Sequence, residues 1–158
     1  MNAFKGTGVA LVTPFTDDLK IDFESLKRLI DHVVKGGVDY LVVLGTTGEA
    51  ATLTTEEKKQ VLKACLEYNE GRVPVMLGIG GNNTQAVLKE IEDTDFYGVA
   101  AILSVSPYYN KPSQAGIIAH YTAIADAAPV PVIMYNIPGR TMSNMTASTT
   151  LKLSHHPN

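Results

Sequence analysis

The sequence predicts an α/β protein in which strands and helices alternate. Five short apolar segments recur about 30 residues apart, which is the length of one strand-helix unit. They begin near Val9, Tyr40, Pro74, Ala100 and Pro131. The segments are continuously apolar rather than alternating, as expected of parallel strands that are buried on both faces. Because apolar residues repeat at helical spacing between them, we expect five βα units.

Residues that start and stop helices mark the ends of the predicted helices. Asp22 and Ser113 are expected N-caps, and Thr54 with Glu57 has the spacing of a capping box. Glycines are expected to end helices before the next strand, namely Gly36, Gly37, Gly71 and Gly98. The segment 83–95 is the weakest predicted helix, because acidic residues in its second half oppose the helix dipole. We expect this helix to end early.

Two architectures accommodate five βα units. One is an open, doubly wound parallel sheet, and the other is the first part of an eight-stranded barrel. The length of 158 residues favours the open sheet, since a closed barrel typically needs about 250 residues. No linker or low-complexity segment interrupts the repeat, so a single domain over residues 1–158 is predicted.

The composition excludes several classes of protein. The net charge of −3 arises from 13 basic and 16 acidic residues spread along the chain, so no basic stripe is available for nucleic acid. The single cysteine, Cys65, lies among apolar residues and is expected to be a buried hydrophobe rather than a reactive thiol. With no internal disulfide possible, we expect the cytoplasm as the compartment.

Membrane and metal functions are not predicted either. No apolar stretch reaches the roughly 18 residues that span a bilayer, and the first eight residues lack the layout of a signal peptide. The histidines show no metal-ligand spacing with Cys, Asp or Glu; they are His32, His120, His155 and His156. We therefore expect no metal site, no cofactor and no membrane partner.

In both architectures ligands bind where strands end, so the polar residues after each apolar segment are the candidates for chemistry. Gly45-Thr46-Thr47-Gly48 combines two main-chain N–H groups and two hydroxyls in one tight turn, which suits a small carboxylate. The alternative is a glycine-closed turn whose threonines satisfy their own backbone. Glu49 is expected to hold the neighbouring loop through hydrogen bonds rather than to act in catalysis. Gly78-Ile79-Gly80-Gly81 lacks a phosphate-binding fingerprint and is interpreted as packing and turn chemistry.

Tyrosines and one arginine follow two later strands. Tyr108 and Tyr109 come after a strand and a proline, where a phenol is able to relay a proton or simply to pack at an interface. Tyr135 ends its strand before a Pro-Gly turn that carries Arg140. In one interpretation the phenol of Tyr135 faces a ligand site and the guanidinium of Arg140 reaches over it. In the alternative, Tyr135 is a buried strand residue and Arg140 is an ordinary surface arginine.

Three motifs occur in a fixed order along the chain. They are Gly45-Thr46-Thr47-Gly48-Glu49, Ser106-Pro107-Tyr108-Tyr109-Asn110-Lys111-Pro112 and Tyr135-Asn136-Ile137-Pro138-Gly139-Arg140-Thr141. Together they resemble motifs of the dihydrodipicolinate synthase family, and the similarity runs from Gly8 to Asn158. That family has a (β/α)8 TIM-barrel fold, so the resemblance implies that this chain supplies about the first five βα units of such a barrel.

The resemblance also implies an activity. The family condenses pyruvate with L-aspartate 4-semialdehyde to 4-hydroxy-tetrahydrodipicolinate, in lysine and diaminopimelate biosynthesis, through a Schiff base on a barrel lysine. By resemblance, Tyr135 is the proton donor and acceptor, Thr46 passes protons to it, and Tyr109 completes the relay across a subunit interface. Thr47 would hold the carboxylate of pyruvate, and Arg140 would bind that of the semialdehyde. A class I aldolase-type lyase that works as a homo-oligomer, a tetramer or a dimer, is therefore expected.

One expected group is missing. In the family the Schiff-base lysine lies on the sixth strand, which would begin just after Asn158. Lys152 precedes that strand on a helix and Lys111 lies in a loop, so neither is expected to substitute. We therefore expect a partial barrel, truncated before the sixth strand, that is inactive alone. Lysine feedback is not expected, because lysine-sensitive members place histidines and a glutamate at the positions of Thr55, Lys58 and Ala86 here.

Other interpretations of the same residues are open. A related pyruvate lyase such as N-acetylneuraminate lyase is one alternative, although Gly139-Arg140-Thr141 favours the synthase. A non-enzymatic alternative is a half-barrel that persists by self-association or by pairing with a complementary fragment. An open-sheet nucleotide-binding domain ranks last, because the chain lacks a phosphate fingerprint.

Overall fold

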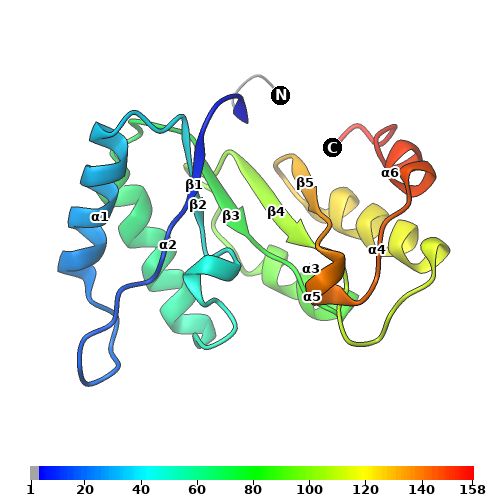
Figure 1. The fold of residues 1–158 in the computed structure, drawn as a ribbon, viewed down its shortest axis with the longest axis horizontal. Coiled ribbons are helices and arrows are strands. Elements are labelled where there is room, and N and C mark those ends of the chain that lie inside the picture. Colours follow the sequence, from blue (N-terminus) through cyan, green and yellow to red (C-terminus); the bar gives the residue numbers. More distant parts are fainter. Residues whose placement is uncertain (1–3) are drawn as a thin grey trace. The chain divides into compact units, whose positions relative to one another are not determined.

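The computed structural model describes residues 4–158, in which strands and helices alternate as predicted (Figure 1). The elements are β1 (Gly8–Ala10), α1 (Phe23–Lys35), β2 (Tyr40–Val43), the 3-10 helix η2 (Thr46–Gly48), α2 (Thr55–Asn69), β3 (Val75–Gly78), α3 (Thr84–Glu92), β4 (Ala101–Val105), α4 (Gln114–Ala127), β5 (Val132–Tyr135), α5 (Pro138–Thr141) and α6 (Ala147–Leu153). They form two compact units. The first contains the described residues up to Gly78 together with Tyr97–Ala100, and the second contains Ile79–Phe96 and Ala101–Asn158.

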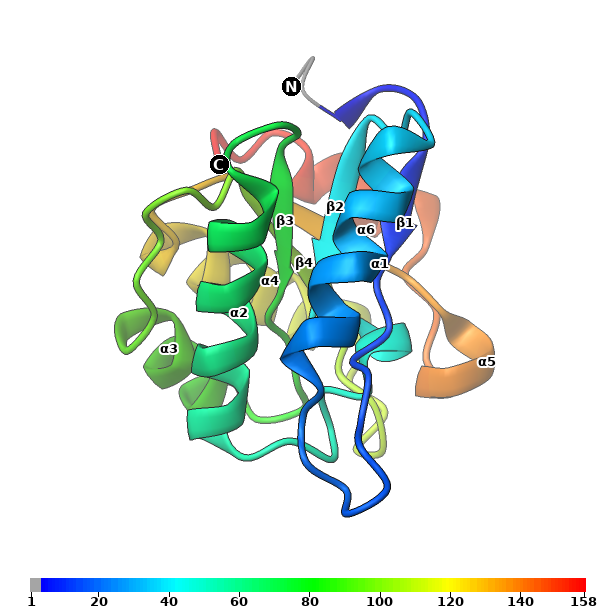
Figure 2. The same cartoon turned by 90° about the vertical axis from the view of Figure 1, so that its left-hand side faces the viewer.

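The first unit is a three-stranded parallel sheet with two helices on one face. β2 pairs with β1 in the register Val9↔Leu41 and with β3 in the register Val42↔Met76. The helices α1 and α2 pack against each other and lie side by side over the strands, as Figure 1 and Figure 2 show from two directions. Every residue of β2 after Tyr40 is buried, which explains its continuously apolar sequence.

The second unit pairs β4 with β5, also in parallel, and contains the helices α3, α4, α5 and α6. The register sets Ile102 opposite Val132 and Val105 opposite Tyr135. α4 contacts α3, α6 and β5, so it is the central helix of this unit (Figure 1). Its apolar stripe of Ile117, Tyr121 and other side chains is buried, as the helical spacing predicts.

The predicted helix starts are confirmed by their hydrogen bonds. The Asp22 carboxylate accepts the N–H of Ser25 at 2.9 Å, and the Ser113 hydroxyl accepts that of Gly116 at 3.2 Å. Thr54 and Glu57 form a complete capping box at the start of α2. These side chains satisfy N–H groups that have no partner inside the helix.

One predicted helix end is wrong and another is confirmed. Gly98 does not end a helix, because α3 already ends at Glu92 with Asp93 as its C-cap. Gly98 has a φ of 81° and instead forms the turn before β4. α3 ends early, as expected from its acidic second half, and Lys89 forms ion pairs with Glu92 and Asp93 at that end.

Two remaining features concern the single cysteine and the length of the helices. Cys65 is buried on α2, as predicted, and burial raises the pKa of its thiol to about 12. Within residues 4–158 no helix combines the length and the apolar character needed to cross a membrane.

Candidate active site

The Gly45–Glu49 motif forms η2 directly after β2. Buried Leu44 has a left-handed φ of 56°, which turns the chain sharply out of the strand. The turn is closed by main-chain bonds alone, from the Gly48 N–H to the oxygen of Gly45 at 3.0 Å and from the Glu49 N–H to that of Thr46 at 3.1 Å. In the described chain no hydrogen bond engages the exposed hydroxyls of Thr46 and Thr47. The threonines therefore do not satisfy their own backbone, and both hydroxyls are open to a ligand.

Other residues of the first unit hold this turn in place through a hydrogen bond and close main-chain contacts. The Thr13 hydroxyl donates a buried 2.7 Å hydrogen bond to the oxygen of Gly48. A Cβ on Gly48 would lie 3.2 Å from the Leu11 oxygen, and a Cβ on Gly78 would clash with the main-chain oxygen of Leu44. Glycine is therefore required at position 78, where β3 passes close to the turn. This confirms that Gly78 serves close packing of the backbone.

Glu49 holds the neighbouring loop, but not in the expected way. Its main-chain oxygen accepts both the N–H and the hydroxyl of Thr52 at 2.9 Å. Its exposed carboxylate makes no hydrogen bond or ion pair with residues 4–158. The loop is thus tied by the backbone of Glu49, whose left-handed φ of 54° aims the carbonyl at Thr52.

Tyr135 is the last residue of β5 and is half-buried. Its main-chain oxygen accepts the N–H of Ser106 at 3.0 Å, which extends the pairing of β4 and β5 beyond Val105. Its phenolic hydroxyl has no hydrogen-bond partner among the described residues. The hydroxyl therefore contributes no hydrogen bond to the fold of this unit.

Arg140 lies on the single-turn helix α5, which follows β5. Pro138 starts this helix at a position where its missing N–H costs nothing. The Arg140 N–H bonds the oxygen of Ile137 at 2.9 Å, while the exposed guanidinium makes no ion pair or hydrogen bond within residues 4–158. Its charge is thus unneutralised by the described chain and suits an anionic ligand.

The Tyr108-Tyr109 loop presents its second tyrosine to solvent. Tyr109 is 86% exposed and has a left-handed φ of 73°, and Lys111 is also left-handed. Asn110 anchors the loop, since its side chain donates to the oxygen of Asn82 at 3.0 Å. Two left-handed residues that are not glycine are costly, which indicates a loop shape set by its surroundings.

The predicted residues are divided between the two units. Thr46 and Thr47 belong to the first unit, whereas Tyr109, Tyr135 and Arg140 belong to the second. No hydrogen bond joins Tyr109, Tyr135 and Arg140 to one another in the described part of the chain. Each side chain is therefore presented separately, by the end of a strand or by the loop that follows it.

Sequence reasoning missed a buried polar cluster beneath the end of β4. The hydroxyls of Ser104 and Ser106 are buried without a hydrogen-bond partner, and the Tyr121 hydroxyl donates to the main-chain oxygen of Ser104 at 2.8 Å. Burial raises the pKa of Tyr121 far above its usual value, although the Tyr135 backbone and the nearby Ser106 hydroxyl oppose that shift. An apolar-looking stripe on α4 gave no signal that Tyr121 would carry a polar contact.

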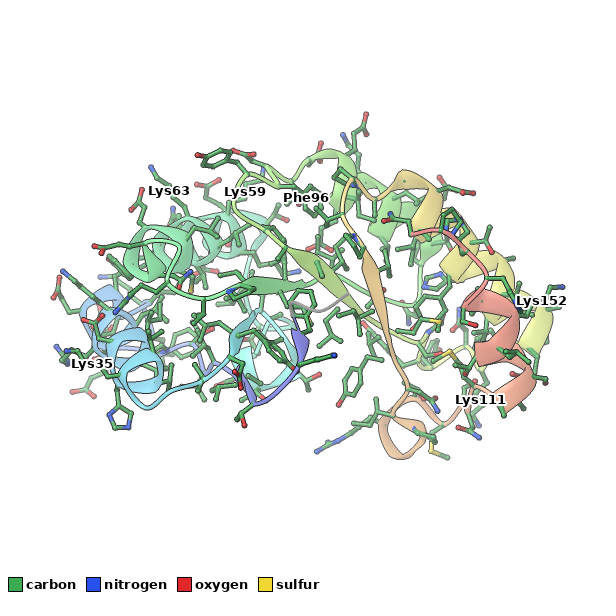
Figure 3. All side chains as sticks on the ribbon, turned by 90° about the horizontal axis from the view of Figure 1, so that it is seen from above. Lys35, Lys59, Lys63, Phe96, Lys111 and Lys152 are labelled. Carbon is green, nitrogen blue, oxygen red and sulfur yellow. The ribbon has the colours of Figure 1, made fainter. Side chains whose placement is uncertain are left out.

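No lysine occupies a strand in residues 4–158. The lysines labelled in Figure 3 are exposed at the outside of the molecule, on helices or, for Lys111, on the loop before α4. Lys152 lies on α6, as predicted. No group of three His, Cys, Asp or Glu side chains in the described residues is arranged to hold a metal ion. The described chain therefore offers hydroxyls and a guanidinium but no strand amine.

The model of the dihydrodipicolinate synthetase family matches residues 3–158. The chain belongs to this family. Among curated relatives, the 4-hydroxy-tetrahydrodipicolinate synthase of Flavobacterium psychrophilum is 56% identical over 154 residues, covering 98% of this chain and 53% of the relative. That of Cytophaga hutchinsonii is 54% identical over 158 residues, covering 100% of this chain and 53% of the relative.

Solved structures of the family agree with this assignment. Dihydrodipicolinate synthase from Aquifex aeolicus matches with a TM-score of 0.90 at 39% identity, covering 96% of this chain and 52% of that one. The chloride-inhibited enzyme from Acinetobacter baumannii, in complex with pyruvate, matches with a TM-score of 0.93 at 40% identity, covering 97% and 53%. The chain thus spans about half the length of the relatives it matches and supplies five βα units of a TIM barrel.

Proposed function

We propose that this chain is the part of a 4-hydroxy-tetrahydrodipicolinate synthase that binds the two substrates and carries protons, while the amine that forms the Schiff base lies beyond Asn158. The observation that carries the proposal is that the fold leaves the side chains of Thr46, Thr47, Tyr135 and Arg140 without intramolecular partners in the described residues. Polar groups that contribute nothing to the fold, in motifs typical of this family, are suited to act on a ligand.

Pyruvate binding is assigned to the η2 turn. The first N–H groups of a short helix have no partner within that helix, and the hydroxyls of Thr46 and Thr47 are open. Such a group of donors suits a carboxylate. In our proposal Thr47 holds the carboxylate of pyruvate, which leaves its ketone carbon free for attack by an amine.

Proton transfer is assigned to hydroxyl groups. Imine formation removes water from an amine and a ketone, and the enamine that follows attacks the aldehyde carbon of the second substrate, so protons move at each step. Tyr135 would donate and accept these protons, and Thr46 would connect it to Tyr109. The high exposure of Tyr109 supports a role for it in the site of a neighbouring subunit, and hence a homo-oligomer, a dimer or a tetramer.

Arg140 is the basis for choosing the second substrate. Its unneutralised guanidinium on α5 suits the carboxylate of L-aspartate 4-semialdehyde, which a bidentate arginine binds well. A lyase that accepts a long sugar-derived aldehyde would have less use for a cation at this position. We therefore prefer the synthase to N-acetylneuraminate lyase as the activity of the whole protein.

Hydrogen bonds between Asn158 and the second unit support the position proposed for the amine. The Asn158 main-chain oxygen accepts the N–H of Val132 at 2.8 Å, and its side chain donates to the oxygens of Ala125 and Ala128. The chain after α6 is therefore aligned with the start of β5, as a following strand would be. A lysine on that strand would supply the amine that no strand of residues 4–158 carries.

The test is reductive trapping. The protein purified from its complete gene is incubated with pyruvate and borohydride, and the intact mass of every polypeptide is recorded. The expected result is one reduced pyruvate adduct on a polypeptide longer than 158 residues, mapped by peptide sequencing to a lysine after Asn158. An adduct on Lys111 or Lys152, or no adduct in a protein that nevertheless makes the product, would refute the assignment of the amine.

A further inference from the structure

The segment between β5 and α6 carries Arg140 and is closed by one asparagine. The Asn136 side-chain oxygen accepts the N–H of Met145 at 3.1 Å, and its amide nitrogen donates to the Asn144 side chain at 2.8 Å. The two ends of the segment are therefore joined. α5, with Arg140 on it, lies inside this closed segment, which we call the arginine segment (136–146).

The interior of the arginine segment is held by its own hydrogen bonds. Thr141 is 1% exposed, and its hydroxyl donates to the main-chain oxygens of Ser143 at 2.7 Å and Ile137 at 3.2 Å. These bonds fix the shape of the segment. They do not fix where the segment sits on its unit, because every partner lies within the segment itself.

Gln114, the first residue of α4, supplies the polar attachment of the segment, beside the packing of buried Met145 in one core cluster with Ile117 and Tyr121 of α4. Its side-chain nitrogen donates to the main-chain oxygen of Asn144 at 2.8 Å. Its side-chain oxygen accepts the N–H of Thr146 at 3.1 Å and the hydroxyl of Thr149 at 2.5 Å. One half-buried amide thus joins α4 to Asn144 of the arginine segment through its donor. Through its acceptor it joins α4 to Thr146, where the segment ends and α6 begins, and to Thr149 of α6.

We propose that Gln114 is a positioning residue that sets where Arg140 stands, and thereby the affinity for the carboxylate-bearing aldehyde; this proposal rests on the proposed function. Gln114 touches no substrate in this scheme. It acts through Asn144 and the closed arginine segment, all within the second unit. α4 is a rigid reference, because it is the central helix of that unit and packs on β5, where the segment begins.

The amide geometry separates this role from simple capping of α6. Gln114→Glu keeps the oxygen that accepts from Thr146 and Thr149, and a negative charge at the start of a helix is favourable. The same change removes the amide donor that bonds the Asn144 oxygen and places a carboxylate oxygen, another acceptor, beside it. Gln114→Glu should therefore loosen the arginine segment at Asn144 while keeping the contacts at Thr146 and Thr149, whereas Gln114→Ala should loosen both.

The experiment uses the protein from its complete gene and two readouts. Hydrogen exchange followed by mass spectrometry reports on peptides over 136–146 and 147–153, and steady-state kinetics give KM for each substrate. For Gln114→Glu we expect faster exchange only in 136–146 and a roughly five- to tenfold rise in KM for L-aspartate semialdehyde. KM for pyruvate should change by less than about twofold, because pyruvate is assigned to the first unit. Gln60→Glu is the matched control on α2 and should change neither readout, because within residues 4–158 the Gln60 side chain bonds only Glu56, at 3.3 Å.

The outcomes separate the positioning role from the proposed function. Unchanged exchange over 136–146 in both Gln114 variants overturns the positioning role, whatever the kinetics. Faster exchange with the two KM values rising together overturns the link to the aldehyde. If the wild type does not condense the two substrates, the proposed function fails, the link to the aldehyde fails with it, and the exchange data alone decide whether Gln114 holds the segment.

Discussion

The hydroxyl of Tyr121 donates a 2.8 Å hydrogen bond to the main-chain oxygen of Ser104 inside the second unit. Tyr121 is 2% exposed and lies on α4, while Ser104 is near the end of β4. The bond therefore joins a helix to the strand whose end leads into the Tyr108-Tyr109 loop. Val105, the next residue of that strand, pairs with Tyr135, so the contact lies one register position from one of the proposed catalytic groups.

Removing this bond should destabilise the protein without changing its fold. Tyr121→Phe keeps the ring and leaves the Ser104 oxygen without its phenolic donor, which costs about 1–3 kcal/mol for a buried polar group. Urea unfolding should show a lower midpoint with an unchanged m value. Tyr68→Phe on α2 is the control, because Tyr68 is less buried and no hydrogen bond of its hydroxyl is present in the described chain. Equal midpoints for Tyr121→Phe and the wild type would mean that the bond contributes nothing net.

The Cys65 thiol should be inert in the folded protein and should make stability sensitive to alkaline pH. Burial raises its folded pKa to about 12 from an ordinary value near 9, so the unfolded chain loses the proton first. This contribution to the free energy of unfolding is complete below about pH 9. It falls by about 1.4 kcal/mol for each pH unit as the pH rises toward 12. Cys65→Ala should remove this slope, and iodoacetamide should label the wild type only when it is unfolded. Rapid labelling under native conditions would contradict the burial of the thiol.

Gly78 should not tolerate a side chain. A Cβ there would overlap the main-chain oxygen of Leu44, and a backbone atom cannot move aside as a flexible side chain does. We expect Gly78→Ala to cost about 3 kcal/mol, measured by denaturant unfolding. Gly81→Ala is the control, because its Cβ would lie 3.5 Å from Val87, an ordinary contact. Similar losses in the two variants would show that the close approach at Gly78 is not specific.

The accuracy of the sequence interpretation depended on how far apart the interacting residues are. Strands and helix starts were predicted correctly, because an apolar run or an N-cap such as Asp22 acts over three or four residues. Gly98 was misassigned, because a glycine with positive φ marks a turn without saying which element it adjoins. The contacts of Gln114 with Asn144 and Thr149 span 30 and 35 residues, so no local pattern reveals them. The open side chains of the site, by contrast, were named because they lie in recognisable motifs.

His120 should make the protein less stable in acid. Burial lowers its pKa in the folded state, and its Nδ1 lies 2.8 Å from the Thr84 hydroxyl. Since the unfolded chain binds the proton more readily, this stabilisation is present above about pH 6.5 and is lost as pH falls through the lower folded pKa. His120→Gln should therefore flatten the fall in the unfolding midpoint between pH 7 and pH 5, while exposed His32→Gln should leave it unchanged. An unaltered acid profile in His120→Gln would rule out this residue as the cause.

Tyr135→Phe should remove catalysis without weakening the fold. The Tyr135 hydroxyl has no hydrogen-bond partner within residues 4–158, so its loss should leave the unfolding midpoint unchanged. If the phenol carries protons as proposed, kcat for the condensation should fall by about 10²–10⁴-fold with little change in either KM. Tyr68→Phe provides the reference for a tyrosine hydroxyl remote from the proposed chemistry. Full activity in Tyr135→Phe would exclude this phenol as the proton carrier, whereas a matching loss of stability would assign it to the fold instead.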